Sequence, residues 1–178
     1  MACTSLTALQ IACGSQGIVS GIERLYVVAF NDLDASTGST FTTASNGMVS
    51  AITLDTGKKY VEVGVLRDTV ELKDSYTANP SNGTGFHTQS FDLTLAGLTP
   101  ENYAFIESVK TQPVSILIKS RLGNYFAAGL NGLMQLEKME GGTGKAAGDL
   151  QGYTLTFSGI ATKSLTQVDP TIVAALIA

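Results

Sequence analysis

The sequence predicts a mainly β protein, a β-sandwich or small barrel of antiparallel strands with one flanking helix and a long projecting hairpin. Nineteen glycines, many threonines and only four prolines favour many strands joined by glycine turns. Apolar and polar residues also alternate with a period of two in several segments. Because 178 residues suffice for one core, we expect a single domain over residues 1–178, with an N-terminal arm (1–20) and a C-terminal tail (169–178).

The first strands are predicted from dense runs of β-branched and aromatic residues. The stretch GIERLYVVAF at residues 21–30 forms one strand, and residues 48–54 form the next. Residues 59–76 form the longest predicted strand. Its apolar positions change from odd to even numbers near residues 66–69, which predicts a β-bulge there.

A long hairpin is predicted around the turn-forming stretch ANPSNGTG at residues 78–85. After this turn, Phe91, Leu93 and Leu95 alternate with polar residues, so a second strand returns beside the first. The residues near the turn are polar and have little to bury. We therefore expect the hairpin tip to project from the body of the protein.

One helix is predicted directly after this hairpin. Thr99 is suited to cap it, Pro100 to the first helical position, and Glu101 to the positive end of the helix dipole. The helix ends before Pro113. Its apolar face is formed by residues spaced in threes: Tyr103, Ile106 and Val109.

The remaining chain again has the pattern of strands. Residues 113–130 form a second hairpin, and residues 133–139 form a short strand. Residues 141–149 form a glycine-rich loop, and residues 150–165 form an amphipathic strand before the apolar tail.

Composition and charge exclude several classes of function. Charged residues make up only 15% of the chain, and the net charge of −4 lacks the basic surface that nucleic-acid and anionic-membrane binders need. One histidine and two cysteines are too few for a zinc or iron–sulfur site, so we expect no cofactor and no metal. We expect Cys3 and Cys13 to be reduced, and no segment to be a signal peptide or a membrane span.

Candidate catalytic and ligand motifs are interpreted as structural. His87 is the single histidine, and the chain has no G-x-S-x-G nucleophile elbow whose serine it could activate. Glu62, Asp68, Glu71 and Asp74 resemble a solvated acidic face more than a pair of glycosidase carboxylates. Three further motifs are read as turns or loops rather than as calcium, phosphate and glycosylation sites: Asp32 with Asp34, residues 141–145, and Asn82-Gly83-Thr84. We expect the protein not to be an enzyme.

Two features of the sequence indicate assembly with other copies. The ending IVAALIA is expected to be an exposed apolar strip on a monomer, and the long hairpin has a poorly buried end. Deleting residues 171–178 is therefore expected to leave a soluble monomer that no longer stacks. The candidate inter-subunit contacts are Asp74, Tyr76, Asn82, Phe86, Ile172, Val173, Leu176 and Ile177.

The order of these segments over residues 21–162 resembles the bacteriophage tail-tube family and related ring proteins of the phage neck and tail, and is similar to secretion-system tube proteins. The resemblance is carried by five segments: GIERLYVVAF, the hairpin around ANPSNGTG, SFDLTLAGL with helix TPENYAFIESVKTQ, ILIKSRLGNYFAAGL, and GDLQGYTLTFSGIAT. The apolar C-terminal tail departs from the family's pattern.

The resemblance implies a non-enzymatic virion subunit of the phage tail or neck, assembled in the host cytoplasm. Its copies would form rings or a stacked tube, with other tail or neck proteins as partners and no membrane. DNA would pass through the channel without specific binding. An acidic inner wall would suit this passage, and its candidate residues are Glu62, Asp68 and Glu71.

Two alternative functions come from other classes. A monomeric β-sandwich could recognise carbohydrate through a platform of Tyr125, Phe126 and Tyr153, although carbohydrate binders favour tryptophan and this chain has none. A β-rich hydrolase is the last alternative, because the sequence offers no credible set of acid, base and nucleophile.

Overall fold

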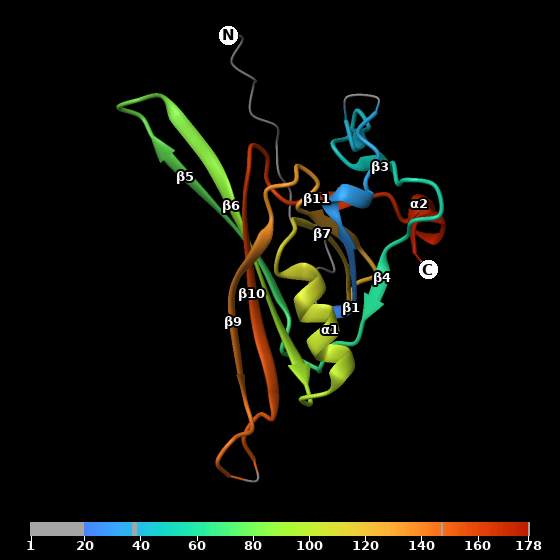
Figure 1. Ribbon diagram of the computed structural model, residues 1–178. Coiled ribbons are helices and arrows are strands. Elements are labelled where there is room, and N and C mark those ends of the chain that lie inside the picture. Colours follow the sequence, from blue (N-terminus) through green and yellow to red (C-terminus); the bar gives the residue numbers. More distant parts are fainter. Residues whose placement is uncertain (1–19, 37–38, 147, 178) are drawn as a thin grey trace.

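The computed structural model describes residues 20–36, 39–146 and 148–177. The predicted mainly β architecture is confirmed: two sheets pack as a sandwich, and neither closes into a barrel in the described chain. Figure 1 shows the four-stranded sheet on one side, the seven-stranded sheet behind α1, and α2 on the far side. The predicted N-terminal arm, with Cys3 and Cys13, lies outside the described residues except for Ser20.

The larger sheet has seven strands in the order β2-β3-β11-β8-β7-β1-β4. All its neighbours pair antiparallel except β11 and β3, which are parallel. A 3-10 turn, η1 (Phe30–Asp32), follows β1. The strands are β1 (Ile22–Ala29), β2 (Phe41–Thr43), β3 (Val49–Ile52), β4 (Val61–Val63), β7 (Val114–Ser120), β8 (Tyr125–Ala128) and β11 (Thr166–Val168).

The smaller sheet has four strands in the order β5-β6-β10-β9, all antiparallel. Its long central pair, β6 and β10, stays in register over ten residue pairs from Gly152 with Ala96 to Ala161 with His87. The strands are β5 (Glu71–Asn79), β6 (Thr84–Ala96), β9 (Gln135–Gly142) and β10 (Gly152–Ala161). The predicted long hairpin is thus confirmed as β5 and β6.

The seven-stranded sheet separates two hydrophobic cores. Successive side chains of a strand point to opposite faces, so Leu25 and Ile116 enter a first core between the two sheets. Their neighbours Tyr26 and Leu117 enter a second core on the opposite face. The central strands of this sheet are therefore buried on both faces.

Helix α1 (Pro100–Val109) confirms the predicted helix and belongs to the first core. The hydroxyl of Thr99 accepts a hydrogen bond from the N–H of Asn102 at 3.3 Å, and Pro100 occupies the first turn. Ile106 and Val109 are buried against the sheets, whereas Tyr103 is exposed.

The prediction of one strand over residues 59–76 is wrong. Val61–Val63 is β4 at the edge of the seven-stranded sheet, and β5 begins at Glu71 at the edge of the other sheet. Residues 64–70 cross between the sheets, and Asp68 adopts a positive φ of 61°. The change of phase in the sequence therefore marks a change of sheet rather than a bulge.

The prediction that the C-terminal residues form an exposed strip is also wrong. They form helix α2 (Pro170–Leu176), which Asp169 caps by accepting a hydrogen bond from the N–H of Thr171. Val173 and Leu176 are buried in the second core, and Ile172 and Ile177 pack half-buried against it. These four side chains, predicted as inter-subunit contacts, thus pack against their own chain.

Tyr60 fixes the end of α2 to the second core. Its N–H donates to the carbonyl of Leu176 at 2.9 Å, and its hydroxyl lies 2.8 Å from the hydroxyl of Ser115. Burial raises the pKa of this phenol, although the hydrogen bond with Ser115 partly opposes the shift. Removing residues 171–178 is therefore expected to expose the second core to water, rather than to leave a folded monomer.

Candidate assembly surface

The outer face of the four-stranded sheet is rich in hydroxyl groups. In β6 and β10, alternate residues such as Leu93 and Leu155 face the first core. The residues between them face outward as cross-strand pairs: Thr94 with Thr154, Asp92 with Thr156, and Ser90 with Ser158. The Thr156 hydroxyl donates to the Asp92 carboxylate at 2.9 Å. This face is mainly polar, although Ile160 is exposed on it opposite Thr88.

The charges on this outer face are largely paired with one another. Lys73 lies 2.8 Å from the Glu71 carboxylate on β5, and Lys138 lies 2.9 Å from the Glu140 carboxylate on β9. Asp92 adds a third carboxylate against these two ammonium groups. The face therefore carries a small excess of negative charge and no unpaired lysine among the residues just named.

The two edges of the same sheet are long, and no strand of the described residues lies beside them. β5 and β9 are the outermost strands, nine and eight residues long. Because every neighbouring pair between them is antiparallel, β5 and β9 run in opposite directions. Such edges present unpaired N–H and carbonyl groups that another strand can bind.

The β5–β6 hairpin extends well beyond the two packed sheets (Figure 1). Tyr76 is 64% exposed, and its ring lies against Gly85 and 5.0 Å from the ring of His87. A side chain at Gly85 would collide with the Tyr76 hydroxyl, so glycine permits this packing. Phe86 is exposed on the opposite face of the hairpin, opposite Thr77.

The hairpin ends in a four-residue loop over residues 80–83. The N–H of Asn82 donates to the carbonyl of Asn79 at 3.3 Å, and the side chain of Asn82 accepts from the Thr84 hydroxyl at 2.8 Å. Gly83 has a positive φ of 68°. Asn82 thus stabilises the turn, as expected from the Asn-Gly sequence.

Asp74 joins the base of the hairpin to a distant part of the chain. Its carboxylate accepts hydrogen bonds from the Ser164 hydroxyl at 2.6 Å and the Leu165 N–H at 3.1 Å, and lies 3.2 Å from Nδ1 of His87. Burial opposes ionisation, but these hydrogen bonds and the His87 ring outweigh it and lower the pKa of Asp74. Asp74, predicted as an inter-subunit contact, has its partners within its own chain.

The arrangement around His87 is not a catalytic triad. The Ser164 hydroxyl donates to Asp74 rather than to the imidazole, so His87 has no serine nucleophile to activate there. The Asp74 carboxylate lies within hydrogen-bond distance of both the Ser164 hydroxyl and Nδ1 of His87. The geometry therefore agrees with the structural interpretation of His87.

Of the three predicted acidic residues of an inner wall, Asp68 and Glu71 line one groove of about 650 Å³, whereas Glu62 lies elsewhere. Glu62 lies on β4 and its carboxylate is 3.4 Å from Arg24 on β1. Asp68 lies in the crossover, where a 2.6 Å hydrogen bond from Arg121 lowers its pKa. Glu71 alone lies on the outer face of the four-stranded sheet, where Asp92 and Glu140 accompany it. The sequence contains a signal for Asp92: it lies between the core residues Phe91 and Leu93 on β6, so the alternation places it on the outer face.

The aromatic platform expected of a carbohydrate binder is not formed. Tyr125 and Phe126 are consecutive on β8 and pack toward the second and the first core, respectively. Tyr153 lies on β10 in the other sheet and packs against the first core. All three rings are half-buried and contribute to the cores of the fold.

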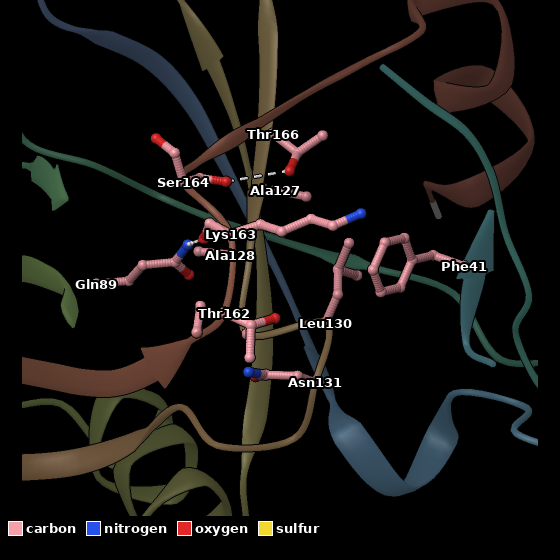
Figure 2. A pocket seen from close by; sticks show the side chains of 12 residues that line it. Phe41, Gln89, Ala127, Ala128, Leu130, Asn131, Thr162, Lys163, Ser164 and Thr166 are labelled. Carbon is pink, nitrogen blue, oxygen red and sulfur yellow. Dashed lines mark hydrogen bonds between the residues drawn. The ribbon is translucent and has the colours of Figure 1, made fainter. Parts of the chain in front are cut away.

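A small hollow lies beside the segment that connects β10 to β11 (Figure 2). The Lys163 side chain extends toward Phe41 in this view, while Gln89 and Thr166 donate to the carbonyls of Lys163 and Ser164. Its volume of about 120 Å³ holds only a few water molecules. Small-molecule sites are larger, roughly 300–1,000 Å³.

Neither α1 nor α2 is long and apolar enough to cross a membrane, and the described ranges contain no other candidate span. No group of three His, Cys, Asp or Glu side chains suited to a metal ion occurs within the same ranges. No protein-family model matches the chain, and a search of curated proteins finds no significant match.

Proposed function

We propose that the protein is a non-enzymatic structural subunit that assembles into rings, or a tube of stacked rings, forming the DNA channel of a phage tail or neck. The observation that carries this proposal is the pair of long, open edges on one sheet, β5 and β9, which run in opposite directions. The β5–β6 hairpin, which projects beyond the two sheets (Figure 1), would give each ring a contact with the next.

The strand directions allow one continuous wall. When copies are related by rotation about an axis along the strands, β9 of one copy meets β5 of the next. These strands are antiparallel, so the sheet continues in the antiparallel pattern that it has within each subunit. A head-to-tail contact of this kind closes into a ring when the rotation is suitable.

The hydroxyl-rich outer face is suited to line the channel. Thr154, Thr156 and Ser158 offer no positive charge to hold a phosphate backbone, and the excess of carboxylates on this face repels it. The opposite face of the sheet is filled by the first core. DNA would therefore pass along this wall without binding it.

The test measures particle size and then the direction of the contact. Sedimentation velocity and negative-stain microscopy of the full chain are expected to show rings or tubes. Glu71→Cys and Lys138→Cys place thiols on the outer face at the two edges, both level with Asp92 on β6, in a Cys3→Ser, Cys13→Ser background. A short bismaleimide is expected to give a ladder of multimers with both changes in one chain.

The matched controls are the two single-cysteine chains. Each alone is expected to give monomers, and an equimolar mixture of the two is expected to give dimers only, because the contact is head-to-tail. A chain that stays monomeric at high concentration, or a single variant that cross-links with itself, would overturn the proposal.

A further inference from the structure

The chain contains three Asn-Gly dipeptides, at residues 46–47, 82–83 and 131–132, and each lies in a loop between strands. In this dipeptide the backbone nitrogen of glycine can attack the side-chain amide of asparagine, because glycine has no Cβ to obstruct the approach. The attack forms a cyclic imide and leads to deamidation. The dipeptide alone gives the three sites the same reactivity, so a difference between them comes from the fold.

At two of these sites the attacking nitrogen is already engaged in a hydrogen bond. The N–H of Gly47 donates to the carbonyl of Ala44 at 2.9 Å, and the N–H of Gly132 donates to the carbonyl of Gly129 at 3.1 Å. The asparagine of the second site is held as well, because its amide donates to a carbonyl of β10 at 2.6 Å. Attack at either site therefore requires a hydrogen bond to break first.

The Asn82-Gly83 site differs at the attacking nitrogen. The N–H of Gly83 makes no hydrogen bond with the residues that the structure describes. A side chain placed at Gly83 would meet nothing within 4 Å, so the loop has room to change shape. The Thr84 hydroxyl donates to Oδ1 of Asn82 at 2.8 Å, which polarises the amide carbonyl that the nitrogen attacks. The nucleophile and the electrophile are thus both prepared at this site alone among the three.

We propose that Asn82 is a site of spontaneous deamidation. The Gly83 nitrogen loses its proton to solvent and bonds to Cγ of Asn82. The Cγ–Nδ2 bond breaks, and Nδ2 takes up a proton and leaves as ammonia. Water then adds to one carbonyl carbon of the cyclic imide and breaks one of its C–N bonds, which gives aspartate or isoaspartate. No group is oxidised or reduced.

The reaction changes the tip of the hairpin, which extends well beyond the two sheets (Figure 1). Either product adds a negative charge there. Aspartate keeps an oxygen that accepts from the Thr84 hydroxyl, whereas isoaspartate lengthens the backbone by a carbon inside the turn that joins Asn79 to Thr84. This inference does not depend on ring assembly, because it concerns only the covalent chemistry of the loop.

The experiment follows the three sites in one sample of the full chain. Trypsin cleaves after lysine and arginine, so it places the sites in separate peptides, residues 25–58, 74–110 and 122–138. Incubation at mildly alkaline pH in water enriched in heavy oxygen labels each new carboxyl group, and tandem mass spectrometry assigns the label to its residue. Because breaking a hydrogen bond slows a reaction roughly five- to tenfold, position 82 is expected to react faster than positions 46 and 131 by that factor.

The matched control is the same chain in concentrated urea, where the loops are absent and the three rates are expected to converge. In the Asn82→Gln variant, the 74–110 peptide is expected to lose most of its label, because attack on the longer side chain is less favourable, while the other two peptides keep theirs. A folded protein in which position 82 reacts no faster than positions 46 and 131 would overturn the proposal. The same holds if the preference for position 82 persists in urea.

Discussion

The two sheets bury their strands differently: the central strands of one are buried on both faces, and those of the other on one face only. In β7 of the seven-stranded sheet, Ile116 and Leu117 are consecutive and both fully buried, one in each core. In β10 of the four-stranded sheet, Leu155 is fully buried while Thr154 remains partly exposed. The central strands of one sheet are packed on both faces, whereas the other sheet has one polar face that is partly exposed.

The largest test removes a similar length of chain from each region. Deleting residues 170–178 removes α2, with Val173 and Leu176, from the second core. Each truncated apolar side chain costs about 2–5 kcal/mol, so the deletion is expected to cancel most of the 5–15 kcal/mol typical of a domain. Circular dichroism and urea unfolding are expected to show a largely unfolded chain.

The matched change shortens the projecting hairpin by replacing residues 77–86 with Asn-Gly, a two-residue turn between Tyr76 and His87. No residue in this segment belongs to either core. The variant is expected to keep its unfolding midpoint within a few degrees while losing any ring stacking. A stable tail deletion or an unfolded hairpin variant would contradict the contrast between the regions.

A second test compares neighbouring residues in one strand of each sheet. Ile116→Ala and Leu117→Ala are each expected to lower the free energy of unfolding by about 2–5 kcal/mol, because each leaves a cavity in a different core. Leu155→Ala is expected to cost the same, but Thr154→Ala less than about 1 kcal/mol. Urea denaturation measures all four, and equal losses at positions 154 and 155 would show that the outer face is structural.

A third and smaller test concerns pH at the point where the hairpin joins the body. The folded pKa of Asp74 is below its unfolded value of about 3.9, so its contribution to stability is present above about pH 4 and is lost as pH falls through the folded pKa. Asp74→Asn is expected to cost about 1–3 kcal/mol at pH 7, because the Ser164 hydroxyl and the Leu165 N–H lose a charged acceptor.

At low pH the wild-type Asp74 carboxyl is protonated and therefore neutral, like the amide of the Asn variant. The free energies of unfolding of the two proteins are then expected to converge. Denaturant curves at several pH values measure the difference. Asp92→Asn, at a partly exposed position on the outer face, serves as the control and is expected to change stability less. A difference between Asp74→Asn and wild type that does not change with pH would contradict the role of the charge.

Local sequence signals predicted the elements whose ends are marked by particular residues. Thr99 and Pro100 marked the start of α1, and Asn82-Gly83 marked the hairpin turn. Asp169-Pro170 provides the same kind of start signal for α2, but the helix was missed because its apolar residues were interpreted as an exposed strip.

Long-range partners could not be predicted, because alternation within a strand does not say which sheet the strand joins. Val63 and Leu72 both pack on the first core, although their strands lie in different sheets, so the crossover looked like a bulge. The outer face of the candidate site followed from the alternation of β6. The contacts of Asp74 did not, because Ser164 and Leu165 are about ninety residues away in sequence.

The link at Asp74 has a mechanical consequence. The hairpin tip projects from the body. A force applied to the tip therefore passes along β5 to the Asp74 carboxylate and, through its hydrogen bonds, to Ser164 and Leu165. The next residue begins β11, which is hydrogen-bonded between β3 and β8 in the doubly buried sheet. A pull on the exposed tip therefore reaches both sheets, the four-stranded sheet through the pairing of β6 with β10 and the seven-stranded sheet through the Asp74 carboxylate.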